Sequence, residues 1–232
     1  MDVLVDGVRQ AVTLLASADR EVLAVLWTSL QVSGTATLIA LLIGIPAGVV
    51  LALTRFPART LVVSAVNTGM GLPPVVVGLF VTILLWRSGP LGALEILYTP
   101  TAIVVAQAVI AAPIVTGITL AAVQNVPAKF RLQLVALGAS RPQMVWVVLR
   151  EARLPMLAAV MAGFGGVISE IGASMMVGGN IKGQTRTLTT AMVLETGKGN
   201  FDVAIALSIL LLVLVFGINW ALTAVQQRRP AG

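Results

Sequence analysis

The feature that most constrains this chain is a series of long apolar stretches. The first, residues 22–53, contains no charged side chain and exceeds the ~20 residues that an α-helix needs to cross a bilayer. Four further stretches follow at 61–86, 100–124, 156–177 and 203–225. Only 10% of the residues are charged, against about a quarter in soluble domains. We therefore predict an all-α, polytopic membrane protein whose residues 1–232 form a single transmembrane domain with five spanning helices.

The segment before the first stretch has a different pattern. Within residues 1–21, Val8, Ala11, Val12 and Leu15 recur at the spacing of one helix face. This favours an amphipathic helix at the membrane interface, with a frayed tail as the alternative. No cationic region precedes a short apolar core, so we expect no cleaved signal peptide.

The composition excludes several classes of function. The chain has no Cys and no His, which excludes thiolate or imidazole metal sites and Ser-His or Cys-His catalytic pairs. Gly197-Lys198 lacks the other residues of a phosphate-binding P-loop, so ATP would have to bind another chain. We expect no catalytic residue, no metal and no cofactor. The net charge of +6 does not indicate nucleic-acid binding, because the bases lie at the ends of apolar stretches without interleaved aromatics.

The bases distribute unevenly between the two sides of a five-span topology. Residues 54–60, 126–155 and the C-terminus share nine Lys and Arg residues and one acid, whereas the other side has six bases and seven acids. The positive-inside rule makes the first side cytoplasmic and the N-terminus external.

Two glycine or proline patterns interrupt the first two stretches. Gly44 and Gly48 form a GxxxG pair that permits close helix approach, although Pro46 between them equally marks a kink. In the second stretch, Pro73 and Pro74 remove two backbone donors, with Gly78 one turn on. Lipid cannot replace these hydrogen bonds, so the segment must face protein or a wet cavity. It is either a kinked packing helix or a broken segment that lines a pathway.

The fourth stretch contains the one ionisable residue that we place within a span, Glu170. It must face protein or water, either as a structural carboxylate or as a gating or proton-relay group. Ser169, Gly172 and Ser174 surround it, and these small residues permit close packing or leave room for a pore.

The polar segment that follows contains Asn180, Lys182 and Arg186. Its cations and free amides suit an oxyanion, but an ordinary external loop that meets acidic groups on a partner explains them equally.

The longest polar interruption, residues 126–155, is called the basic insert here. It has one acid, Glu151, and five bases, Lys129, Arg131, Arg141, Arg150 and Arg153. Ala128 to Leu137 is compatible with a helix, and Gly138-Ala139-Ser140 breaks it. This pattern predicts a docking surface on the basic side of the membrane.

Several motifs resemble one family. Leu137-Gly138-Ala139-Ser140 with the later Leu154-Pro155 resembles the coupling loop of binding-protein-dependent ABC importer permeases, although Leu132, Gln133 and Leu134 stand where that motif has Glu-Ala-Ala. Leu72 to Gly78 and Ile168 to Ile181 are similar to the molybdate and tungstate permeases, and to the tungstate type above all. The likeness covers nearly the whole chain.

The resemblance implies a type I ABC importer permease fold in a prokaryotic inner membrane. It further implies a homodimer, two cytoplasmic ATPase subunits and an external oxyanion-binding protein. The ATPase contact would involve Lys129, Arg131, Leu137, Gly138, Ala139 and Ser140. Tungstate is the expected substrate, with molybdate or another oxyanion as the alternative. A channel or secondary transporter that works without ATP is a further alternative, and it leaves the basic insert unexplained.

Overall fold

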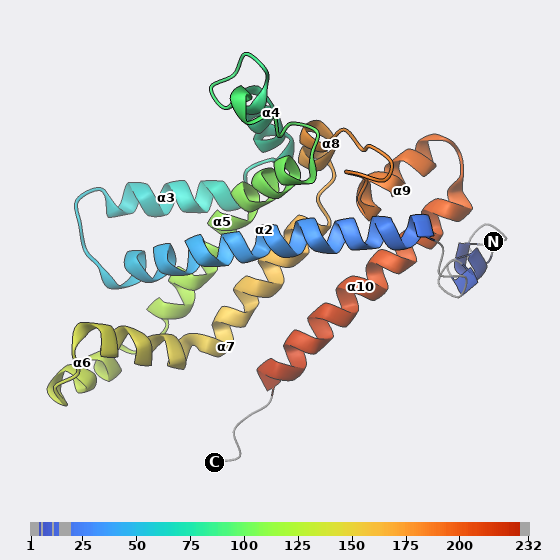
Figure 1. Ribbon diagram of the computed structural model, residues 1–232. Helices are drawn as coiled ribbons and strands as arrows, with labels where there is room; N and C mark the ends of the chain where they lie inside the picture. Colours follow the sequence, from blue (N-terminus) through green and yellow to red (C-terminus); the bar gives the residue numbers. More distant parts are fainter. Residues whose placement is uncertain (1–4, 6, 11, 14–19, 228–232) are drawn as a thin grey trace.

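The computed structural model describes residues 5, 7–10, 12, 13 and 20–227, which form a long bundle of helices (Figure 1). All regular structure in these residues is helical, as predicted. The elements are α2 (Arg20–Leu53), α3 (Arg59–Met70), α4 (Pro74–Leu85), a 3₁₀ turn η1 (Gly92–Leu94), α5 (Pro100–Gln124), α6 (Ala128–Ala136), α7 (Arg141–Ile168), α8 (Gly172–Gly178), α9 (Leu188–Gly197) and α10 (Phe201–Gln227).

The GxxxG pair places α2 against α5 at the centre of the bundle. A Cβ on Gly44 would lie 2.8 Å from Cβ of Val115, and one on Gly48 would lie 2.7 Å from the carbonyl oxygen of Thr116. These distances are too short for any side chain, so the two helices approach as closely as they do only because both positions are glycine. Pro46 lies inside α2, which continues past it. The packing role of the pair is confirmed.

Three helices, α2, α5 and α10, are long and apolar enough to cross a membrane. Two bent pairs raise the number to five if each pair forms one span: α3 with α4, and α7 with α8. The five-span topology therefore depends on these pairs.

The helix boundaries differ from the predicted stretches at both pairs. Where the sequence indicates one span over 61–86, the structure has two helices at 101° to each other. The stretch at 156–177 belongs to α7, which begins at Arg141, and to α8, at 58° to it. The second half of the basic insert is therefore not a loop but the first half of α7. Charged residues do not end this helix, because they lie on its exposed side while Val148 and Ala152 are buried.

The predicted N-terminal helix lies mostly outside the described residues. Those described between residues 5 and 13 are helical, and Gly7 lies against Ile205 of α10. A location at the membrane interface stays a prediction.

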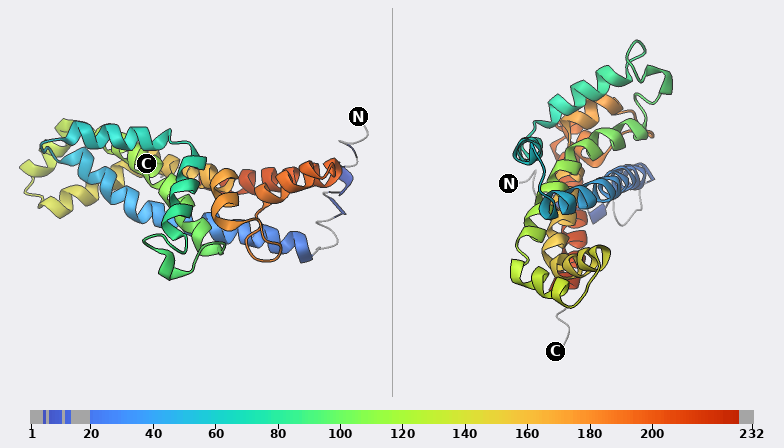
Figure 2. Two further views of the ribbon diagram at one scale, coloured as in Figure 1. Left: turned by 90° about the horizontal axis from the view of Figure 1, so that it is seen from above. Right: turned by 90° about the vertical axis from the view of Figure 1, so that its left-hand side faces the viewer.

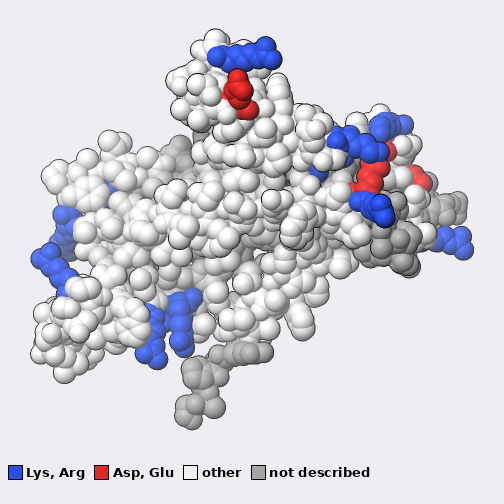
Figure 3. All heavy atoms as spheres, viewed as in Figure 1, with Lys and Arg blue, Asp and Glu red and all other residues white. Residues whose placement is uncertain are grey.

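Most charged residues lie toward the two ends of the bundle. Figure 2 shows the α2–α3 turn and α6 at one end and the starts of α2 and α10 at the other. In Figure 3 the first end carries Lys and Arg alone, the opposite end carries both signs, a further group lies on the projecting segment after α4, and the middle of this face has no charged side chain.

Candidate functional site

The first break in the bundle separates α3 from α4. Pro73 has an extended backbone, with φ −59° and ψ 125°, and Pro74 begins α4. A proline is well placed there, because the first N–H groups of a helix have no partner within it. The carbonyl oxygen of Pro73 then accepts from the N–H of Val76 at 2.9 Å, which starts the new helix. The paired prolines thus produce a sharp corner rather than a mild kink.

The second break separates α7 from α8 at Ser169, Glu170 and Ile171. Glu170 is 8% exposed, and its carboxylate accepts a hydrogen bond from the N–H of Ala173 at 2.9 Å. The carboxylate therefore satisfies a backbone donor in the first turn of α8. From α9, the hydroxyl of Thr189 donates to the carbonyl oxygen of Glu170 at 3.1 Å. Glu170 thus lies between two helices, not inside a continuous span as the sequence suggested.

The two breaks meet each other, and we call this contact of α4 with α8 the junction. A Cβ on Gly78 would lie 2.7 Å from Cα of Ala173, and one on Gly172 would lie 2.7 Å from the side chain of Val75. The structure therefore brings together Pro74, Gly78, Glu170 and Gly172, which lie far apart in the sequence. The absence of a side chain at Gly78 and Gly172 allows the two short helices to approach this closely.

Ser169 and Ser174, which the sequence analysis placed with Glu170, differ in their surroundings. Ser174 is 1% exposed and accepts a hydrogen bond from Gln107. Ser169 is exposed, and its hydroxyl donates to the carbonyl oxygen of Gly165 at 2.8 Å, within its own helix. Only Ser174 is part of the buried junction.

Gln107 is a junction residue that the sequence did not single out. Its Nε2 donates to the carbonyl oxygen of Val167 at 3.0 Å and to Oγ of Ser174 at 3.2 Å, while the residue is 1% exposed. Its Oε1 is buried and has no hydrogen-bond partner among the described residues. Leaving such an oxygen unpaired costs about 1–3 kcal/mol. The available signal was an amide in the middle of an apolar stretch.

The polar segment after α8, residues 179–187, is called the outer loop here. Thr185 closes it, because its hydroxyl donates to the carbonyl oxygen of Gly178 at 2.6 Å and accepts from the N–H of Ile181 at 2.9 Å. At its end, the N–H of Leu188 donates to Oγ of Ser29 in α2 at 2.8 Å. The loop is therefore anchored to both α8 and α2.

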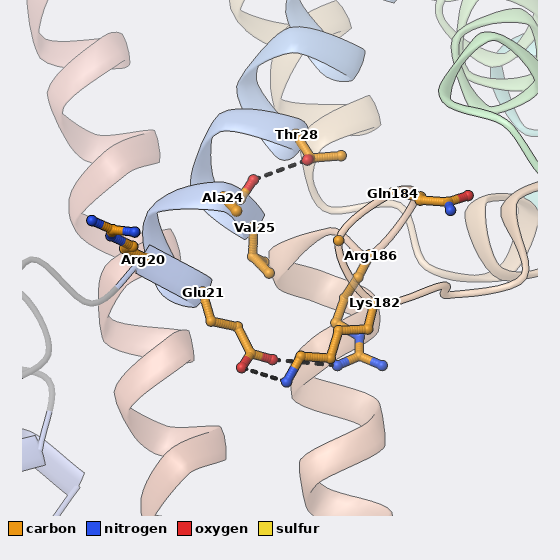
Figure 4. Close-up of a pocket in the computed structure, with 9 residues that line it drawn as sticks. Arg20, Glu21, Ala24, Val25, Thr28, Lys182, Gln184 and Arg186 are labelled. Atoms are coloured by element: carbon orange, nitrogen blue, oxygen red, sulfur yellow. Dashed lines mark hydrogen bonds and ion pairs between the residues drawn. The ribbon is translucent and has the colours of Figure 1, made fainter.

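The cations of the outer loop point at a carboxylate of the same chain (Figure 4). Nζ of Lys182 lies 2.6 Å from Glu21, and a guanidinium nitrogen of Arg186 lies 3.7 Å from it. Nε of Arg186 also donates to Oδ1 of Asn180 at 3.3 Å. Lys182, Arg186 and Glu21 line a pocket of about 240 Å³ (Figure 4), and Arg20 contributes to the same lining. An oxyanion in this pocket would have to compete with Glu21 for both cations.

The tip of the basic insert is the most exposed apolar surface at its end of the molecule. Leu132, Val135 and Leu137 are 68%, 59% and 83% exposed, whereas Phe130 and Leu134 pack against the rest of the bundle. Lys129 and Arg131 lie in the same short helix, α6.

A tight turn joins α6 to α7. Gly138 adopts φ +80°, a left-handed conformation that favours glycine, and no described atom lies near the position of its missing Cβ. The N–H of Ala139 donates to the carbonyl oxygen of Leu134 at 3.0 Å, and Ser140 begins α7 with a capping box that includes Gln143. The turn therefore presents an open surface with hydrogen bonds on both sides of Gly138.

The fold defines a class of protein. The chain superposes on one described as "Inward facing conformations of the MetNI methionine ABC transporter: CY5 native crystal form" with a TM-score of 0.74 and 24% identity, over 90% of this chain and 94% of that one. This likeness concerns the fold alone, which is that of type I ABC importer permeases.

The family follows from the sequence. A profile of the family "Binding-protein-dependent transport system inner membrane component" matches residues 44–229, and the chain belongs to this family. It is 37% identical to the tungstate uptake system permease protein TupB of Peptoclostridium acidaminophilum, over 98% of this chain and 100% of that protein. It is 29% identical to the molybdenum transport system permease protein ModB of Escherichia coli strain K12, over 71% of this chain and 75% of that protein. The resemblance that the motifs indicated is confirmed.

Proposed function

We propose that this chain is the transmembrane permease subunit of an ATP-driven importer for a tetrahedral oxyanion, and that the oxyanion is tungstate. The observation that supports this most is the similarity to a tungstate uptake permease over 98% of the chain, with no part of that relative left unmatched. Molybdate is the alternative substrate, because the molybdenum permease is also related.

The proposed assembly has two copies of this chain, two cytoplasmic ATPase subunits and an external oxyanion-binding protein. The exposed apolar tip of α6, with Leu137 83% exposed, supports the ATPase contact, because such side chains outside the spanning helices favour burial by a partner. Lys129, Arg131, Gly138, Ala139 and Ser140 belong to the same contact. The ATPase subunits hydrolyse ATP, and this chain forms the pathway.

The orientation places the basic insert in the cytoplasm and the start of α2 outside. Figure 3 supports it, since on the face shown one end of the molecule carries bases alone and the opposite end carries both signs.

The junction is the proposed wall of the pathway. Its irregular backbone at Pro73, Pro74 and Glu170 requires protein or water around it rather than lipid. In this proposal Glu170 is a structural carboxylate, because it accepts from the N–H of Ala173, and Gly78, Gly172 and Ser174 allow the close approach. In the outer loop, Asn180, Lys182 and Arg186 hold the outer end of α2 through Glu21 rather than bind the oxyanion directly.

The test is transport by the reconstituted complex. The chain is co-purified with its ATPase subunits, placed in liposomes with the binding protein, and supplied separately with labelled tungstate, molybdate and sulfate. We expect uptake of tungstate that requires both ATP and the binding protein. Uptake without ATP would instead indicate a channel or secondary transporter, and ATP-driven uptake of molybdate alone would reassign the substrate.

A further inference from the structure

Gln107 occupies an apolar position of α5. Ile103 and Ile110 lie on the same helix face, one turn before and one turn after it, and both belong to a buried cluster with Ala173 and Val177 of α8. A leucine or methionine would fill this position without any polar requirement. The amide therefore needs a reason other than packing.

Its hydrogen bonds reach both helices of the second break. In an uninterrupted helix, the carbonyl oxygen of Val167 would accept from the N–H of Ile171. Here it accepts from the N–H of Glu170 at 3.2 Å and from Nε2 of Gln107 at 3.0 Å. The same Nε2 reaches Oγ of Ser174 in α8 at 3.2 Å. One side chain of α5 thus connects the last turn of α7 to α8.

The orientation of the amide follows from its partners. A backbone carbonyl can only accept, so the NH₂ group must face Val167, and Oε1 must point elsewhere. There it has no partner among the described residues. Placing Nε2 of Gln107 as a donor at the break therefore leaves its Oε1 buried without a partner among the described residues.

The break lies on the mechanical route from the basic insert. α7 runs from Arg141 to Ile168 and continues past Pro155, so a single helix connects the insert to Val167. Beyond the break, Thr189 connects Glu170 to α9 by a hydrogen bond of 3.1 Å. The contacts that hold α7 to α8 therefore decide whether α8 and α9 move together with the basic insert and α7.

We propose that Gln107 is a positioning residue that holds the angle between α7 and α8 and so couples movement of the basic insert to the junction. The proposal rests on the permease function proposed above. Gln107 contacts no ATPase subunit, and it acts through the backbone of Val167 and through Ser174.

The test replaces the amide with a side chain of similar length, Gln107→Met. Thr119→Val is the matched control, because Thr119 is also fully buried on α5 and its hydroxyl also lacks a partner among the described residues. In the reconstituted complex, three quantities are measured: the amount of assembled complex, the rate of ATP hydrolysis and the tungstate taken up per ATP hydrolysed. For Gln107→Met we expect at least about a threefold fall in uptake per ATP, with unchanged assembly and an unchanged half-saturating concentration of binding protein. Thr119→Val should match the wild type.

Other outcomes overturn the proposal. Unchanged uptake per ATP in assembled Gln107→Met complex would show that the amide couples nothing. If Gln107→Met does not assemble, Gln107→Leu is measured in the same way, and failure of both to assemble makes the amide a folding requirement only. Failure of the wild-type complex to take up an oxyanion would refute the permease function itself, which keeps the two failures distinct.

Discussion

The tip of the basic insert and the junction both contain glycine, and Gly138 of the tip and Gly78 of the junction have opposite surroundings. No described atom lies within 4 Å of a Cβ built on Gly138, whereas a Cβ built on Gly78 would lie 2.7 Å from Cα of Ala173. The junction is complete within one chain, because its close contacts and most of its polar groups have partners there. The tip leaves Leu137 83% exposed, which supports the proposed contact with a partner. Substitutions should therefore affect stability at the junction and assembly at the tip.

The largest effect is expected at the tip. Gly138→Arg adds a bulky charge to the proposed ATPase contact, and it should reduce recovery of the ATPase subunit with the solubilised chain by at least about tenfold, a change of roughly 1.4 kcal/mol. Gly183→Arg is the matched control, since Gly183 has φ +74°, compared with φ +80° at Gly138, and equally open space, but lies in the outer loop. Equal loss of the ATPase subunit in both variants would show that strain, and not the contact, is responsible.

At the junction, Gly78→Ala should weaken the fold of the chain itself. The added methyl group meets the backbone of α8 and forces α4 away, which costs about 1–3 kcal/mol. Thermal unfolding of the purified chain in detergent measures the loss. Gly165→Ala is the control, because no described atom lies within 4 Å of a Cβ there. Similar midpoints for the two variants would contradict the close contact between α4 and α8.

Two substitutions of Glu170 separate its structural from its gating interpretation. Glu170→Leu leaves the N–H of Ala173 without its partner and should cost about 1–3 kcal/mol of stability. Glu170→Gln keeps an acceptor oxygen, so both stability and oxyanion uptake should stay close to wild type. Loss of uptake in a stable Glu170→Gln variant would instead assign the carboxylate to gating or proton relay.

The smallest effect is expected at the turn between α9 and α10. Hydrogen bonds from Lys198 and then from Asn200 hold the pKa of Glu195 below its ordinary value of 4.5. Because the folded state lowers this pKa, the stabilisation is present above the ordinary value and is lost as the pH falls through the lowered value. Amide hydrogen exchange at the turn should be slower in the wild type than in Glu195→Gln at neutral pH. The difference should vanish in acid, and a difference that persists there would contradict the origin of the effect.

The sequence motifs predicted the junction residues better than they predicted the helices that contain them. Pro73, Pro74 and Glu170 were identified because each is costly in a helix exposed to lipid, and that cost does not depend on the partner. Gly172 was identified because small residues permit close packing. Hydropathy did not locate the corner after Gly71 or the bend after Ile168, since apolar residues lie on both sides of each break. Nor could charge locate the start of α7, because a helix that is half buried carries arginines on its free side.

The sequence by itself determined the class of this protein. Long apolar stretches indicate helices in a membrane, the uneven distribution of bases predicts their orientation, and the motifs indicate an importer permease. Only the tertiary structure decided that Gly78 touches Ala173, that Lys182 and Arg186 turn to Glu21, and that Gln107 connects α7 to α8. The reason is physical. The free energy of transfer from water to lipid is a sum over individual residues, so it can be read from the sequence. Contacts between residues 60 or more positions apart depend on how the helices pack.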